Sequence, residues 1–273
     1  MSKPKVQIII PVINLWEKYT KQCIDSVIKA CDNIDYRILL IDNCSTDETI
    51  TEAGKLVSSL FAHKRNEERW GVAQSWNYGV RDAFERGYEY VLILNNDILI
   101  HKDSIDKIIE RFEKENSSEN IVNNEIAMIT MMDIRGECPE PTNLFDKNSE
   151  DYKVVPESEH PNYSAFMINK KYWDIVGKFD EGFKPAYFED NDSHYRMKLA
   201  GLKAIVLPTA LFYHYGSRTQ NESAHSMPVV KGIQFEKNRQ YFAQKWGGVP
   251  GQEKFTTPFN DNTKDTKWCF QSK

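Results

Sequence analysis

The tripeptide Asn95-Asn96-Asp97 is the part of the sequence whose residue types and position say most about chemistry. It directly follows the apolar run 90–94, which is typical of a strand buried on both faces of a parallel sheet. Ligands of open α/β sheets bind at the carboxyl ends of strands, so we expect Asp97 to meet a bound ion or substrate. Oxygen donors of this kind suit a hard divalent cation, which in turn suits a diphosphate. The tripeptide alone is equally compatible with a turn that caps the next helix, because Asn and Asp favour both positions.

Three further polar clusters follow predicted elements, namely Asp42, Glu189 with Asp190, and His214. Transfer of a group from a diphosphate requires charge neutralisation at the leaving group and a base for the attacking hydroxyl. Asp97 and His214 could share one divalent ion, because carboxylate and imidazole are both compatible with manganese. Asp190 could accept the proton. Alternatively, Glu189 and Asp190 are ordinary first-turn acids of a helix, and His214 is a structural or surface histidine.

The elements that must position these residues alternate between strand and helix. Apolar runs predict strands at 6–10, 37–41, 90–94, 126–131, 163–168, 204–207 and 211–214. Helical spacing predicts helices at 16–31, 72–86, from 103 or 104 to beyond 112, at 171–176, 188–201 and 229–246. This alternation indicates an α/β fold with a Rossmann-like, mostly parallel central sheet flanked by helices. The proline-containing stretch 133–161 breaks the pattern and predicts a long loop.

Composition excludes several classes of protein. The formal net charge of −5 argues against a surface built mainly to hold nucleic acid. The five cysteines form no Cys-x-x-Cys pair, so we expect reduced thiols and neither structural zinc nor dithiol chemistry. The amino terminus lacks the pattern of a secretory signal, and no apolar run approaches the roughly 20 residues that cross a bilayer. We therefore expect a cytoplasmic protein without a transmembrane segment, for which peripheral membrane contact stays possible.

The order and spacing of several motifs resemble glycosyltransferase family 2, which has the GT-A fold. The Asn-Asn-Asp tripeptide stands where that family has Asp-x-Asp, a variant similar to that of bacterial rhamnosyltransferase-like enzymes. The motifs that carry the resemblance are Pro11, the segment 41–47, Asn95-Asn96-Asp97, Gly182-Phe183, Phe188-Glu189-Asp190, Arg196, and Leu207-Pro208 leading to His214. The resemblance runs from about Val6 to Gly248. It predicts one catalytic domain at 1–248, including a helix at about 229–246, and a polar tail at 249–273.

The resemblance implies a role for each candidate residue. Asp190 would be the general base, with Glu189 as a second catalytic carboxylate. Asp97 and His214 would hold Mn²⁺ or Mg²⁺, although Asn in place of Asp lowers the charge offered to the ion. The residues implied in nucleotide-sugar binding are Pro11, Asn14, Asp42, Asn66, Gly71, Asn77, Asn95, Asn96 and Arg218.

The function implied is inverting transfer of a sugar from a UDP- or dTDP-linked donor to an acceptor hydroxyl. The acceptor could be a saccharide, a lipid-linked saccharide, a protein or a modified nucleobase. Two alternatives are a sugar nucleotidyltransferase and a nucleotide-sugar binding module without turnover. The first usually has a glycine-rich basic loop after the first strand, whereas this chain has Pro11 to Asn14 there.

Overall fold

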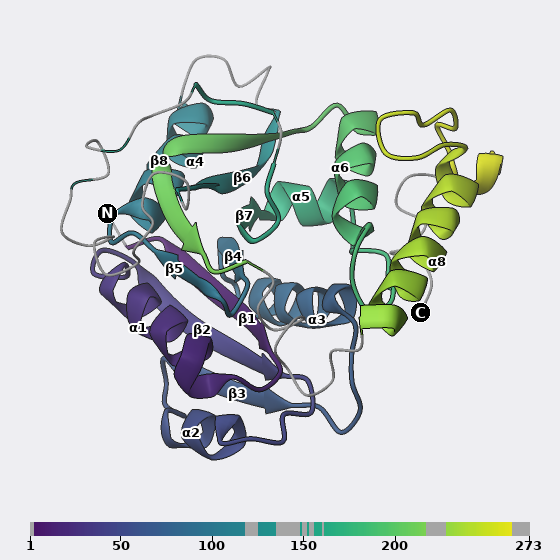
Figure 1. Ribbon diagram of the computed structural model, residues 1–273. Helices are drawn as coiled ribbons and strands as arrows, with labels where there is room; N and C mark the ends of the chain where they lie inside the picture. Colours follow the sequence, from purple (N-terminus) through teal and green to yellow (C-terminus); the bar gives the residue numbers. More distant parts are fainter. Residues whose placement is uncertain are drawn as a thin grey trace.

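A mixed sheet forms the centre of the computed structural model, with helices on both of its faces (Figure 1). The structure describes residues 3–117, 125–134, 148, 152, 156–159, 161–216 and 228–263. In the described part, the strand order is β3-β2-β1-β4-β7-β6-β8-β5. The strands are β1 (Lys5–Val12), β2 (Asp35–Asp42), β3 (Phe61–Arg65), β4 (Tyr90–Leu94), β5 (Ile98–Ile100), β6 (Ile126–Asp133), β7 (Ala165–Asn169) and β8 (Lys203–His214). The helical elements are η1 (Trp16–Thr20), α1 (Lys21–Lys29), α2 (Thr49–Lys55), α3 (Val72–Glu85), α4 (Ser104–Ser117), α5 (Lys170–Ile175), α6 (Glu189–Leu199), α8 (Pro228–Trp246) and η5 (Pro258–Asn260).

The strand directions confirm the predicted α/β class with a mostly parallel sheet. Strands β2, β1 and β4 run parallel, β3 joins β2 in the same direction, and β6 is parallel to β8. Strand β7 is antiparallel to both β4 and β6, and the short β5 is antiparallel to β8. The carboxyl ends of β1, β2 and β4 therefore meet at one edge of the sheet, which is where ligands of such sheets bind.

Alternate residues of β1 pack on opposite faces of the sheet, as the two-residue period of a strand requires. Ile8 and Ile10 belong to the apolar cluster that includes residues of α1 and α4. Ile9 belongs to the cluster on the other face, which includes Trp76 and Val80 of α3. Because both faces are covered, the strand is apolar throughout its centre.

Three local predictions were wrong in detail. Strand β3 was not predicted, because Phe61–Arg65 carries charge in place of an apolar run, whereas helix α2 begins at Thr49, directly after the helix-start residues 43–48. The helix predicted over 16–31 begins as the π-helical turn η1 and continues as α1. The two predicted strands at 204–207 and 211–214 belong to one strand, β8, which has a bulge where the β6–β8 register shifts between Leu207 and Leu211. Proline is tolerated at such a bulge, where its missing N–H costs no ladder hydrogen bond.

A buried ionic network joins α8 to α6. The carboxylate of Asp192 accepts hydrogen bonds from Arg196 Nε (2.9 Å) and Trp246 Nε1 (2.8 Å), and Lys245 Nζ lies 2.5 Å from it. Lys245 Nζ also donates to Asp180 Oδ2 at 2.7 Å. Burial opposes the charge of Asp192, but Lys245 and Arg196 outweigh it and lower the pKa of this carboxyl. The C-terminal helix is thus a fixed part of the fold beside α6 (Figure 1).

Part of the predicted tail beyond Gly248 packs back onto this helix. The backbone N–H groups of Lys254 and Phe255 donate to Trp246 O, and Tyr195 Oη donates to Phe255 O. Among the helices that the structure describes, none combines the length and apolar character that a bilayer crossing requires.

Candidate functional site

The strand pair β5 and β8 brings Asp97 and His214 together. In the antiparallel register Ile98 faces His214, so Asp97, one residue before β5, lies at the end of β8. The backbone N–H of Tyr215 donates to Asp97 O at 3.0 Å and fixes this arrangement. His214 Nε2 lies 3.3 Å from Asp97 Oδ1. Two residues 117 positions apart in the sequence thus present a carboxylate and an imidazole to the same point, as the predicted ligand pair requires.

The two asparagines of the tripeptide have different surroundings. Asn96 is buried, and its Nδ2 donates to Thr20 Oγ1 at 2.9 Å. Asn95 is half-buried, its backbone N–H donates to Ser164 O, and its carbonyl accepts a 3.6 Å contact from Cys23 Sγ. Asn95 therefore has the more accessible side chain, whereas Asn96 ties the tripeptide to η1.

Asp42, at the carboxyl end of β2, is fully buried and held by donors on several sides. Arg65 Nη1 donates to Oδ2 at 2.9 Å, the backbone N–H of Ser45 donates to Oδ1 at 2.7 Å, and His63 Nε2 lies 3.5 Å from Oδ2. Burial alone would raise the pKa of Asp42, but His63, Ser45 and the Arg65 charge outweigh burial and lower it. The carboxylate is therefore an ionised acceptor at the place predicted for the nucleobase.

Asn14 organises the loop that follows β2. Its Oδ1 accepts hydrogen bonds from the backbone N–H groups of Thr46 (2.7 Å) and Asp47 (3.4 Å), and its own N–H donates to Ser45 Oγ. Pro11 lies on β1 beside Ile41, in the register that also pairs Val12 with Asp42. Both residues lie at the sheet edge that carries Asp42, and their predicted contact with a nucleotide stays a prediction.

The remaining residues of the predicted nucleotide segment surround the start of α3. Asn66 Nδ2 donates to Asn43 Oδ1 at 2.6 Å, and Gly71 is the N-cap of α3. A Cβ on Gly71 would lie 3.1 Å from Pro185 O, which explains why a small residue is needed there. The side-chain amide of Asn77 is engaged within the protein, because Nδ2 donates to Phe179 O and Oδ1 accepts from Phe179 N–H, both at 2.8 Å.

Asp190 lies in the first turn of α6, directly after a strained turn. Tyr187 and Phe188 have φ angles of 81° and 74°, a left-handed conformation that costs a non-glycine residue about 1–3 kcal/mol. Asp190 is half-buried, and its Oδ1 accepts a hydrogen bond from the N–H of Asn191 at 2.8 Å. Strain of this kind is common at functional sites, where the surrounding structure must hold it.

Burial changes the proton affinity of both carboxyls at this turn. It raises the pKa of Asp190 above the usual aspartate value, although the backbone N–H groups of Asn191, Asp190 and Phe188 oppose the rise. The helix dipole alone favours an ionised Asp190. Burial has the opposite effect and moves the pKa of Asp190 upward, toward the working pH, where a general base is most effective. Burial and the neighbouring Asp190 charge raise the pKa of Glu189 well above its usual value, which favours the protonated form.

Hydrogen bonds link the Asp42 region to the turn before Asp190. Asn43 Nδ2 donates to Ser75 Oγ of α3 at 3.1 Å, and the N–H of Val72 donates to Pro185 O at 2.8 Å. The first turn of α3 thus bridges the carboxyl end of β2 and the segment leading to α6.

A second link runs from Asp190 to the tripeptide through Tyr163. Burial raises the pKa of the Tyr163 hydroxyl well above its usual value, and the charge of Asp190 adds to this rise. The next residue, Ser164, accepts a hydrogen bond from Asn95 N–H at 2.9 Å. Asp190 therefore lies within electrostatic range of the segment that is bonded to the end of β4.

The Asp97 and His214 side chains fit a divalent ion. His214 Nε2 is buried and, despite the short distance to Asp97, makes no aligned hydrogen bond among the described residues. An imidazole nitrogen and a carboxylate oxygen that face each other in this way are suitable ligands for Mn²⁺. No group of three or more His, Cys, Asp or Glu ligands occurs in the described ranges, so an ion here would need oxygens from a bound diphosphate or water.

One predicted site residue lies outside the described part of the chain, and two residues of the site were not predicted. Arg218, predicted to contact the donor phosphates, lies outside the described residues. His63 and Arg65, which hold Asp42, were not predicted, because the strand β3 that carries them has no apolar pattern. Their one sequence signal is a run of three basic residues, 63–65.

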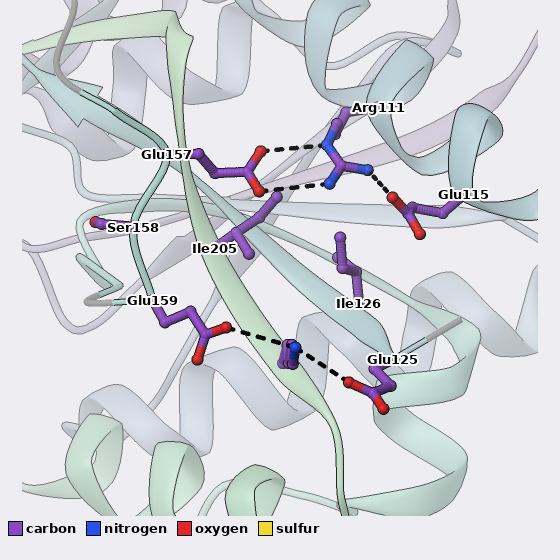
Figure 2. Close-up of a pocket in the computed structure, with 9 residues that line it drawn as sticks. Arg111, Glu115, Glu125, Ile126, Glu157, Ser158, Glu159 and Ile205 are labelled. Atoms are coloured by element: carbon purple, nitrogen blue, oxygen red, sulfur yellow. Dashed lines mark hydrogen bonds and ion pairs between the residues drawn. The ribbon is translucent and has the colours of Figure 1, made fainter. Parts of the chain in front are cut away.

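A hollow of about 280 Å³ at the opposite edge of the sheet has different chemistry (Figure 2). Ile126 and Lys203, at the amino ends of β6 and β8, belong to its wall. Arg111 Nε lies 3.3 Å from Glu157, and Lys203 Nζ lies 3.2 Å from Glu125. Figure 2 shows Arg111 paired with Glu157 and Glu115 at this hollow.

Comparison with solved structures places this fold among glycosyltransferases. The structure of residues 1–349 of S. aureus TarS in complex with UDP matches with a TM-score of 0.55 and 18% identity, over 88% of this chain and 72% of that chain. The same TarS fragment with UDP-GlcNAc gives a TM-score of 0.58 at 21% identity, over 88% and 65% of the two chains. GalNAc-T7 with UDP, GalNAc and Mn²⁺ gives 0.58 at 17% identity, over 89% of this chain and 51% of that chain.

These identities establish the fold alone, and they confirm the predicted GT-A architecture. This chain spans about half the length of the GalNAc-T7 chain. No curated protein sequence matches it. The family model described as glycosyl transferase family 2 matches residues 7–173, which is more than half of the chain. The chain therefore belongs to glycosyl transferase family 2.

Proposed function

We propose that this family 2 glycosyltransferase transfers a sugar from a UDP- or dTDP-linked donor to an acceptor hydroxyl with inversion at the anomeric carbon. The observation that carries the proposal is the pair of Asp97 and His214, 3.3 Å apart at the sheet edge where Asp42 also lies. The complexes of TarS with UDP-GlcNAc and of GalNAc-T7 with UDP support a uridine nucleotide as the donor. The resemblance to rhamnosyltransferase-like enzymes supports the thymidine alternative.

The chain's own groups divide the work between donor and acceptor. Asp42 accepts a hydrogen bond from the nucleobase, and the half-buried Asn95 faces the donor. Asp190 accepts the proton of the acceptor hydroxyl as its oxygen attacks the anomeric carbon and the bond from that carbon to the diphosphate oxygen breaks. Mn²⁺ or Mg²⁺ bound by Asp97 and His214 would supply positive charge to stabilise the departing diphosphate.

The products balance the reactants in this step. One acceptor O–H bond and one sugar–phosphate bond break, one glycosidic bond forms, and the proton passes to Asp190. A single displacement inverts the anomeric carbon. Family membership favours this reaction over a nucleotidyltransferase or a binding module without turnover.

Release of nucleoside diphosphate from a panel of nucleotide sugars tests the proposal. Wild-type protein with Mn²⁺ or Mg²⁺ should release UDP or dTDP from at least one sugar nucleotide. Asp190→Asn should lose about 10²–10⁴-fold in rate, because a general base contributes about that much, while it still binds the nucleotide. Asp174→Asn is the matched control, since Asp174 is an exposed carboxylate on α5 and its replacement should leave the rate unchanged. Absence of turnover and of binding across the whole panel would refute the proposal.

A further inference from the structure

Asn238 of α8 binds the backbone of the turn that precedes Asp190. Its side chain is 2% exposed, and Nδ2 donates to Ala186 O at 2.9 Å and to Tyr187 O at 3.1 Å. A primary amide has two N–H donors, so both of them are used on this one turn. None of the sequence motifs described above includes this residue.

The turn that Asn238 contacts is the strained one. Tyr187 and Phe188 both have positive φ angles, and such conformations persist only where neighbouring groups hold them. Their rings also pack on α8, with centroid distances of 5.4 Å from Tyr187 to Phe235 and 6.0 Å from Phe188 to Phe242. Helix α8 therefore holds both the side chains and the backbone carbonyls of this turn.

Helix α8 is itself fixed near its C-terminal end, at Lys245 and Trp246. Lys245 contacts Asp180 and Asp192 at 2.7 and 2.5 Å, and Trp246 Nε1 donates to Asp192 at 2.8 Å. Asp192 is on α6, two residues after Asp190. The Asn238 amide and the Asp192 network thus join α8 to both sides of the Asp190 position.

We propose that Asn238 is a positioning residue for the glycosyl transfer step: it holds the 186–188 turn so that the Asp190 carboxylate keeps its place at the start of α6. This proposal rests on the proposed function, in which Asp190 is the base. Reacting groups must be held closely, and a misplacement of about 1 Å can cost about 100-fold in rate. The amide acts from outside the nucleotide-binding edge, so it should affect the chemical step and leave donor binding unaffected.

Steady-state release of nucleoside diphosphate by full-length Asn238→Ala and Asn238→Asp tests this role. The aspartate variant keeps the shape of the side chain but cannot donate to the two carbonyls when it is ionised. In both variants kcat should fall by about 10- to 100-fold, with donor KM and UDP affinity within about twofold of wild type. The matched control is Gln240→Ala, which removes an exposed amide from the same helix and should leave kcat unchanged.

A pH profile distinguishes positioning from a purely structural role. The N–H of Phe188 helps to lower the pKa of Asp190, and the titratable groups around this carboxyl include Glu189, Tyr163 and Asp192. If the turn relaxes, that N–H moves away and the acid limb of kcat shifts to higher pH in the Asn238 variants. Variants with a lower melting temperature but wild-type kcat and an unshifted acid limb would overturn the proposal.

The proposed function and the role of Asn238 fail in different ways. A wild-type protein that releases no nucleoside diphosphate from any donor refutes the function itself. Normal turnover by wild type and by Asn238→Asp refutes the positioning role alone. If Asn238→Ala does not fold, Asn238→Asp decides between the outcomes, and a wild-type kcat in that variant counts against the proposal.

Discussion

The two adjacent carboxyls at the start of α6, Glu189 and Asp190, differ in exposure and in hydrogen bonding. Glu189 is 5% exposed, and its Oε2 has no hydrogen-bond partner among the described residues, so the neutral acid is favoured. Asp190 is half-buried and accepts a backbone hydrogen bond, which supports its ionised form. The more accessible of the two is therefore the candidate base, and Glu189 lines its buried side.

The first prediction concerns the pH dependence of turnover. Asp190 must be ionised to accept a proton, and burial raises its pKa, so activity is present above that raised pKa and lost as the pH falls through it. The acid limb of kcat should lie above about pH 3.9, the value for an unperturbed aspartate. A profile of kcat against pH, with UDP binding measured over the same range as the control, checks this. An acid limb at or below the ordinary value would contradict the assignment of Asp190.

At the residue scale, the sequence could identify groups but could not give their surroundings. Asp97 and His214 were predicted as a pair, and the β5–β8 register brings them to 3.3 Å. Their role as metal ligands stays a prediction. Asn77 looked like a nucleotide contact, yet its amide holds the Phe179 backbone, a partner about 100 residues away that no local pattern reveals.

At the scale of elements, helix α3 depends on close contact with β1 at Gly79. A Cβ at this position would lie 2.5 Å from Ile9 Cδ1. We predict that Gly79→Ala lowers the free energy of unfolding by about 1–3 kcal/mol through overpacking. Gly54→Ala in α2 is the control, because a Cβ added there would meet no atom within 4 Å and alanine should stabilise the helix by about 0.5–1 kcal/mol. Denaturant unfolding measures both, and equal effects would refute the packing argument.

The contact between α6 and α8 gives a second prediction at this scale. Asp192→Asn leaves Arg196 buried without its carboxylate and Lys245 with Asp180 alone, which should cost about 3–5 kcal/mol in the free energy of unfolding. Because the folded-state pKa of Asp192 is lowered, its contribution is fully present above the unfolded pKa and is lost as the pH falls through the folded value. Chemical denaturation between neutral and acidic pH checks the sign. A variant as stable as wild type at neutral pH would show that this buried network does not stabilise the contact between α6 and α8.

The elements that the sequence predicted well are those in which apolar residues recur at the regular spacing of a strand or a helix. The runs 6–10, 37–41 and 90–94 lie within β1, β2 and β4, and the spacing of 72–86 predicted α3. Strand β3 could not be predicted, because its order comes from pairing with β2 and from the contacts of Arg65 and His63 with Asp42. The antiparallel direction of β7 was also beyond a local pattern, since direction depends on how the preceding loop returns to the sheet.

In the whole molecule, the order and direction of the strands bring the predicted site residues to one edge of the sheet. The parallel strands β1, β2 and β4 end at one edge, and α3 bridges that edge to the turn before Asp190. Helix α8, last of the long helices in the described part, then packs on α6 (Figure 1). The sequence predicted the order of these elements, but the dependence of the Asp190 turn on Asn238 appears only when the chain is folded.

In the proposed mechanism, nucleotide, divalent ion and base share this one edge of the sheet. A crystal structure of the protein with UDP and Mn²⁺, with the anomalous signal of manganese recorded, would locate all three groups. We expect a manganese peak bound by Asp97, His214 and the diphosphate, with the uracil at Asp42 and with Asp190 facing the open side of the diphosphate. Manganese or UDP bound elsewhere, with the Asp97–His214 pair empty, would contradict it.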